Sequence, residues 1–102
     1  MFALVVRFDL RDAEAADAFD ALLAETLPLI TEREPGTLVY ATHTPQDAPL
    51  ARIFYEVYAD REAHAAHEAT PHTSRFLAAV RDWVSDVRLE LLGSPTGKGL
   101  PG

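Results

Sequence analysis

The sequence predicts an α+β domain in which helices cover a four-stranded antiparallel sheet. Apolar residues alternate with a period of two in four segments, which is typical of strands. Between these segments they recur at three- and four-residue steps, which is typical of helices. The segments follow the order strand, helix, strand, strand, helix, helix, strand. This is the order of the ferredoxin-like (split βαβ) fold with its second helix broken in two.

The first strand is expected at residues 2–9, where one face is wholly apolar and must meet helices. Asp12 then caps a long helical pattern, which ends by Glu34-Pro35-Gly36. Pro28 lies inside this pattern. Because proline lacks the backbone donor, we expect it to kink or interrupt the helix near residues 24–27.

Turn and cap residues divide the rest of the chain. Asp60 is a good N-cap, and Thr70-Pro71 puts proline at a first helical position. The expected elements are strands at 37–44 and 51–59 joined by a turn at 45–49, short helices at about 61–68 and 71–82, and a last strand at 84–92. Residues 1–92 should form a single domain, and residues 93–102 a flexible C-terminal tail or a dimer arm.

Composition excludes several classes of function. A net charge of −7 disfavours nucleic acid and anionic membranes as partners. The absence of cysteine removes disulfides, thiolate metal sites and cysteine nucleophiles. No apolar run approaches the roughly 20 residues that span a bilayer, and the N-terminus does not resemble a signal peptide, so the expected location is cytoplasmic.

Three of the four histidines lie close together, at His64, His67 and His72. Imidazole is the side chain best suited to moving a proton near neutral pH, so chemistry is expected here. The alternative is that one of them braces the broken helix through a backbone carbonyl. His64 and His67 are spaced to share a metal, and His72 or Glu68 is a conceivable third ligand. His64, however, falls among alanines on the expected outer flank of its helix, so we expect no metal site.

The sequence resembles the antibiotic biosynthesis monooxygenase family of dimeric α/β barrels over about residues 2–92. The resemblance is carried by three motifs: Glu34-Pro35-Gly36, Tyr55-Glu56-Val57-Tyr58 with Asp60, and His67…Thr70-Pro71-His72…Phe76. It implies a homodimer whose two sheets face each other, with a pocket between each sheet and its own helices. Members include oxygenases of quinols and aromatic polyketides that use O₂ without metal or flavin, haem-degrading enzymes and sugar-derivative isomerases.

The expected site combines this resemblance with strand and helix periodicity. His67 and His72 are the candidate bases, and Tyr55, placed on the helix-facing side of its strand with Ile53 and Val57, is the candidate donor to an oxyanion. Phe76, His64, Phe19 and Leu23 are the expected pocket wall. Val5, Arg7, Glu56 and Tyr58 are the expected dimer seam, with Arg7 and Glu56 forming an ion pair there.

The expected function is that of a cofactor-independent monooxygenase acting on a hydroxylated aromatic, polyketide or quinol-like molecule, with O₂ as co-substrate. Two alternatives remain open. One is an isomerase or polyketide cyclase in which a pair such as His72 and Tyr55 shuttles a proton. The other is a ligand-binding dimer without catalysis. Oxygen uptake distinguishes the first reading from both alternatives.

Overall fold

The computed structural model describes residues 1–101. Its elements are β1 (Phe2–Leu10), α1 (Ala13–Arg33), β2 (Thr37–His43), β3 (Ala51–Tyr58), α2 (Arg61–Ala69), α3 (Pro71–Val80) and β4 (Val84–Leu92). The four strands form one antiparallel sheet in the order β2-β3-β1-β4. Both the element order and the sheet confirm the predicted α+β, ferredoxin-like fold.

The predicted caps are present. The Asp12 carboxylate accepts a hydrogen bond from the Ala15 amide at 2.8 Å, and the Asp60 carboxylate accepts one from the Ala63 amide at 2.8 Å. Pro28 does not interrupt α1, which runs as one helix of 21 residues. Buried residues occur on both sides of the proline, so tertiary packing holds both halves of the helix against the sheet.

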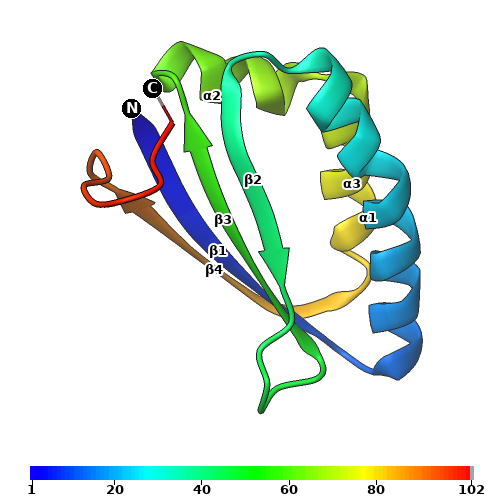
Figure 1. Cartoon of the computed structure of the whole chain (residues 1–102). Coiled ribbons are helices and arrows are strands. Elements are labelled where there is room, and N and C mark those ends of the chain that lie inside the picture. Colours follow the sequence, from blue (N-terminus) through cyan, green and yellow to red (C-terminus); the bar gives the residue numbers. More distant parts are fainter. Residues whose placement is uncertain (102) are drawn as a thin grey trace.

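Helices α1 and α3 cover one face of the sheet, and the other face is open (Figure 1). The core under these helices is aromatic. Phe54 of β3 lies 5.1 Å from Phe8 of β1, and Phe19 of α1 lies 5.2 Å from Phe76 of α3, between ring centroids. Such tilted and edge-on pairs add to the stabilisation from area burial, so this cluster anchors both helices to the sheet.

The strand register corrects the predicted orientation of β3. Leu4 of β1 lies opposite Glu56, and Val5 lies opposite Tyr55. Directly opposite residues share a face of the sheet. Glu56 is therefore on the helix-covered face with Leu4, while Tyr55 is on the open face with Val5, the reverse of the prediction.

The reversal has a physical cause. A period of two divides the side chains of β3 into an uncharged set, which contains Ile53, Tyr55 and Val57, and a set that contains two charged residues, so the uncharged set was expected under the helices. The set that is buried under the helices contains Arg52, which the sequence pattern would place in solvent. Its guanidinium is paired with both carboxylate oxygens of Asp20 on α1, each at 2.9 Å.

Strand β4 forms an edge of the sheet that the helices leave uncovered (Figure 1). Val87, Leu89 and Leu91 point to the helix side, opposite Phe8, Val6 and Leu4, yet they are 47%, 56% and 62% exposed. These three residues form an apolar margin of β4 beside the core.

Residues 93–101 follow β4 without forming helix or strand. The hydroxyl of Ser94 donates to the backbone carbonyl of Met1 at 3.0 Å, and the tail turns back toward the N-terminus (Figure 1). Within residues 1–101, no helix has the length and apolar character needed to cross a membrane.

The turn between α1 and β2 packs tightly on α2. A Cβ added to Gly36 would lie 2.7 Å from the Cβ of Ala63, and the Gly36 carbonyl accepts a hydrogen bond from the Ala59 amide at 2.9 Å. This turn also contains Glu34, so its position matters for the site described below.

We expect Gly36→Ala to lower the free energy of unfolding by about 1–3 kcal/mol, because the added methyl group overpacks this contact. Urea denaturation measures the change. Gly93→Ala is the matched control, since a Cβ there meets nothing within 4 Å. Equal stability of the two variants would show that the turn is not constrained by α2.

Candidate functional site

A pocket of about 200 Å³ lies between the helix-covered face of the sheet and the helices. Its apolar wall comes mainly from β1, α3 and the margin of β4, and its polar groups come from all three helices and from β2 and β3. The lining residues are Leu4, Val6, Phe8, Thr26, Tyr40, Glu56, His64, His67, Glu68, Thr73, Phe76, Leu77, Val87 and Leu89. A mostly apolar cavity with a few polar groups is typical of a small-molecule site.

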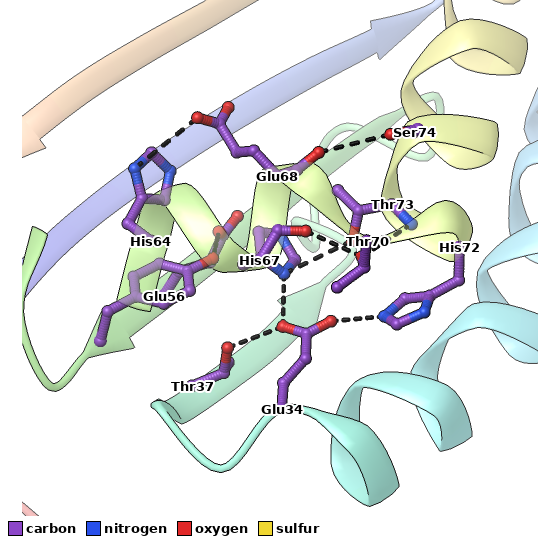
Figure 2. Close-up of polar contacts among 11 residues, drawn as sticks. Glu34, Thr37, Glu56, His64, His67, Glu68, Thr70, His72, Thr73 and Ser74 are labelled. Atoms are coloured by element: carbon purple, nitrogen blue, oxygen red, sulfur yellow. Dashed lines mark hydrogen bonds and ion pairs between the residues drawn. The ribbon is translucent and has the colours of Figure 1, made fainter. Parts of the chain in front are cut away.

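A buried carboxylate organises the polar side of this pocket. Glu34, whose side chain is 5% exposed, lies between two imidazoles (Figure 2). Its Oε1 is 2.6 Å from Nδ1 of His67, and its Oε2 is 2.5 Å from Nε2 of His72. The hydroxyl of Thr37 also donates to Oε1, at 2.7 Å. Both carboxylate oxygens are thus held in place.

Local sequence explains how these groups meet. Glu34 is the C-cap of α1, His67 lies in the last turn of α2, and His72 lies in the first turn of α3. Thr70 separates the two short helices: its hydroxyl donates to the His67 carbonyl at 2.8 Å and also accepts from the Thr73 amide at 3.3 Å. The break between α2 and α3 therefore places both imidazoles around one carboxylate.

The protonation states follow from burial and these hydrogen bonds. Burial by itself would raise the pKa of Glu34, but hydrogen bonds from His72, Thr37 and His67 outweigh it and lower the pKa. Burial lowers the pKa of His67 below its ordinary value, against the opposing effect of Glu34. At neutral pH the carboxyl of Glu34 is ionised and His67 is neutral, with its proton on Nδ1, where it can donate to Glu34.

The other ring nitrogen of His67 is available to a ligand. The two nitrogens of an imidazole point in nearly opposite directions, so Nε2 points away from Glu34. No hydrogen bond within residues 1–101 uses this nitrogen, and no buried side-chain nitrogen or oxygen in that range lacks a partner. Nε2 is therefore not fully buried, and His67 is one of the residues that line the pocket.

A second buried carboxyl, that of Glu56, lines the pocket directly, whereas Glu34 lies behind His67. Glu56 is 5% exposed and accepts a hydrogen bond from the hydroxyl of Tyr58. Burial raises the pKa of Glu56 to about 7; the Tyr58 hydrogen bond opposes this shift, and the charges of Glu68 and Glu34 add to it. Unlike Glu34, this group is divided between its acid and carboxylate forms near neutral pH.

His64 completes the pocket next to β1. Its ring stacks on Phe2 with a centroid separation of 4.8 Å, and its Nδ1 is 3.9 Å from Glu68 (Figure 2). Within residues 1–101, no group of three or more His, Cys, Asp or Glu side chains has the arrangement needed to hold a metal ion.

The structure brings together some of the residues predicted to form the site. His67, His64 and Phe76 line the pocket. His72 is held on Glu34 and does not line it. Tyr55 was wrongly placed in the site, because it lies on the open face of the sheet.

Two predicted wall residues lie elsewhere. Phe19 is fully enclosed in the aromatic core, at 0% exposure. Leu23 lines a different hollow together with His43 and Arg52. This hollow lies between α1 and the end of β2 and start of β3. Both side chains face inward on α1, as their spacing indicates. They pack against parts of the sheet other than the part that borders the pocket.

The predicted dimer seam is only partly on the open face. Val5 and Arg7 lie there, whereas Glu56 and Tyr58 are buried under the helices. An Arg7–Glu56 pair is therefore ruled out, because the two side chains are on opposite faces of the sheet. Arg7 instead pairs with Asp9 on its own strand at 3.1 Å.

Sequence reasoning missed Glu34 as a site residue, because it was interpreted as a helix end and as part of a family motif. One signal was present. The C-terminus of a helix carries partial negative charge, so an acidic residue there is unfavourable unless it has another partner. Tyr40 was also missed; it lines the pocket, with its ring centroid 5.3 Å from that of His67.

The profile of the antibiotic biosynthesis monooxygenase family matches residues 1–79. The chain belongs to this family. A search of the curated proteins finds no match. The family relationship therefore rests on the profile and on solved structures.

Several solved structures share the fold of this family member. A protein from Bacteroides thetaiotaomicron, provisionally named an antibiotic biosynthesis monooxygenase, is 29% identical, with a TM-score of 0.83 over 99% of this chain and 94% of its own. A Nitrosomonas europaea protein with the same provisional name is 25% identical, with a TM-score of 0.82 over 92% and 98%. A Mycobacterium tuberculosis protein is 25% identical, with a TM-score of 0.84 over 96% and 98%.

We expect Glu34→Gln to lower the free energy of unfolding by about 3 kcal/mol at pH 7, because it removes the charge that two buried imidazoles contact. A carboxyl whose pKa is lowered by folding stabilises the protein above its unfolded pKa, and this contribution is lost as the pH falls through the folded pKa. The deficit of the variant should therefore shrink as the pH falls below about 4.5, the ordinary pKa of a glutamate, toward the lower pKa of the folded protein.

Urea denaturation at several pH values measures this deficit. Glu32→Gln, at an exposed position in the same helix, is the matched control. A Glu34→Gln variant as stable as Glu32→Gln at pH 7 would contradict the structural role of the buried carboxylate.

Proposed function

We propose that this family member is a cofactor-independent monooxygenase that acts on a hydroxylated aromatic, polyketide or quinol-like molecule. The observation that carries the proposal is the neutral imidazole of His67, held through Nδ1 by the buried Glu34 at the wall of an apolar pocket. The family relationship supports the reaction class. The pocket supports the substrate class, because its aromatic and aliphatic walls suit a flat apolar molecule.

The chemistry begins with removal of a proton. Nε2 of His67 accepts the proton of a substrate hydroxyl, which converts the molecule into an electron-rich anion that can transfer an electron to O₂. The carboxylate of Glu34 fixes the tautomer of the imidazole and stabilises the imidazolium that forms. A buried acid beside a catalytic histidine has the same two effects in hydrolase triads.

The apolar walls have a separate effect. Phe76, Leu4 and Val6 line the pocket near the polar groups, so a bound molecule displaces water from this side of the cavity. Exclusion of water protects a reactive anion and the oxygenated intermediate from side reactions. The same walls would also suit the two alternatives, a proton-shuttling isomerase or cyclase and a non-catalytic binding protein.

Oxygen uptake separates these functions. With a panel of quinols and anthrones, a monooxygenase consumes one O₂ per molecule converted, an isomerase or cyclase forms product without O₂, and a binding protein does neither. The Tyr55–His72 shuttle considered for the isomerase is excluded on geometry, because Tyr55 lies on the open face of the sheet.

We expect His67→Ala to lower turnover of a competent substrate by on the order of 10²-fold or more, because the base is lost. An oxygen electrode measures the rate, with protein purified without an affinity tag and treated with chelator. His43→Ala, at an exposed histidine outside the pocket, is the matched control. His67→Gln tests the same role with a side chain that can still donate to Glu34.

If His67→Ala and His67→Gln both lose stability but keep the turnover of the folded fraction, the imidazole is a brace and not a base. Circular dichroism and thermal unfolding measure the folded fraction of each variant, so that a loss of stability can be separated from a loss of turnover.

We further propose that the protein is a homodimer whose subunits meet through the open face of the sheet. Val5, Ile53 and Tyr55 form an apolar patch on this face and remain only half-buried within one chain. No helix covers this face of the sheet (Figure 1). A second copy of the same face would bury this patch, and an obligate interface of this kind exceeds roughly 2,000 Å² in total.

We expect Val5→Glu to shift the protein toward monomer or misfolding, because it places a charge in an apolar interface. Analytical ultracentrifugation at micromolar concentration measures the change. Ala21→Glu, on the exposed side of α1, is the control for the added charge. A wild-type protein that sediments as a well-folded monomer would overturn the proposed dimer.

A further inference from the structure

The pocket contains a buried carboxyl, that of Glu56, to which the proposed reaction has so far assigned no role. Glu56 lies opposite Leu4 of β1 and opposite Tyr40 of β2, on the face of the sheet that the helices cover. It is 5% exposed and lines the pocket. Its neighbours on both adjoining strands also line the pocket.

One oxygen of Glu56 is held and the other is not. The hydroxyl of Tyr58 donates to Oε1. No hydrogen bond within residues 1–101 uses Oε2, and no buried side-chain oxygen in that range is left without a partner. Oε2 is therefore not fully buried, and because Glu56 lines the pocket, this oxygen can meet a molecule bound there.

The surroundings keep a large fraction of this carboxyl protonated near neutral pH. None of the residues that line the pocket is Lys or Arg. The titratable groups around Glu56 are Tyr40, Tyr58, His64, His67, Glu68 and Glu34. The carboxylates among them add negative charge, and burial raises the pKa of Glu56 to about 7.

We propose that Glu56 is a second catalytic residue, which exchanges a proton with the substrate at the carbon that is oxygenated, while His67 exchanges a proton at the hydroxyl. This inference rests on the proposed function. It applies to those molecules of the proposed class in which a ring hydroxyl is conjugated with a reactive C–H group, as in the enol form of an anthrone.

The two residues balance the reaction. His67 takes the hydroxyl proton, and the anion and O₂ form a C–O bond, which leaves a peroxide anion on the carbon. Glu56 gives its proton to this peroxide. The carboxylate of Glu56 then takes the C–H proton as the C–H electron pair forms a carbonyl and the O–O bond breaks. The departing hydroxide takes the proton from His67, so one water leaves and both residues regain their starting forms.

The variant Glu56→Gln tests this role with little change in shape. The glutamine oxygen can still accept the hydrogen bond from Tyr58, but the side chain cannot exchange a proton near neutral pH. Glu25→Gln, on the exposed side of α1, is the matched control. Circular dichroism establishes that each variant is folded.

The decisive measurement is made without oxygen. Anthrone is incubated anaerobically with the protein in D₂O, and mass spectrometry follows exchange of its methylene hydrogens. We expect the wild-type protein and Glu25→Gln to accelerate the exchange, and Glu56→Gln to slow it by on the order of 10²-fold. If Glu56→Gln exchanges as fast as wild type, or if wild type does not accelerate exchange, the proposal is overturned.

Oxygen uptake judges the proposed function separately. If the protein exchanges these hydrogens through Glu56 and yet consumes no O₂ with any quinol or anthrone of the panel, that result would support the role of Glu56 and reject the monooxygenase. If O₂ is consumed, kcat should fall as the pH rises through about 7, because the acid form of Glu56 is needed. Glu56→Gln should lack this alkaline decrease.

A thermal measurement on the free protein tests the titration of Glu56. A carboxyl whose pKa is raised by folding stabilises the protein below its unfolded pKa, and this contribution is lost as the pH rises through the folded pKa. The melting temperature of Glu56→Gln relative to wild type should therefore increase between pH 5 and pH 8. A difference that does not change with pH would contradict a proton-exchanging Glu56.

Discussion

The arrangement of the site depends on one buried carboxylate. Glu34 ends α1, contacts His67 of α2 and His72 of α3, and accepts a hydrogen bond from Thr37 at the start of β2. Four elements that are separate along the chain are tied together at this point. Burial of a charge is unfavourable unless hydrogen bonds replace its hydration, and here both oxygens have partners. The network therefore specifies how the broken helix pair sits on the end of α1.

The aromatic core and the carboxylate network have different effects on the pocket. The cluster around Phe54 fixes α1 and α3 on the sheet but carries no chemistry. The network at Glu34 fixes the orientation of a single imidazole at the pocket wall. Beyond the core, the helices do not reach β4, and its apolar margin with Leu89 supplies the far side of the pocket. The cavity thus lies between the aromatic core and the polar network at Glu34.

The two buried carboxyls show how environment assigns different behaviour to the same side chain. Glu34 receives several hydrogen bonds, two of them from imidazoles, and its pKa is lowered, so it remains an anion that orients His67. Glu56 accepts one hydrogen bond, from Tyr58, in an apolar wall without a nearby cation, and its pKa is raised to about 7. The first group is fixed in one state, whereas the second can change state within the physiological range. This difference separates an orienting group from a proton-exchanging one.

The order and type of the elements could be predicted from the sequence because they depend on near neighbours. The caps at Asp12 and Asp60, the break at Thr70-Pro71 and the alternation in each strand are all visible within a few residues. The cluster of histidines was visible for the same reason. Tertiary structure decided which face of β3 the helices cover, because the buried face contains Arg52, whose partner Asp20 lies 32 residues away along the chain. It also decided the partners of Glu34, which are 33 and 38 residues away along the chain, a distance over which only folding brings side chains together.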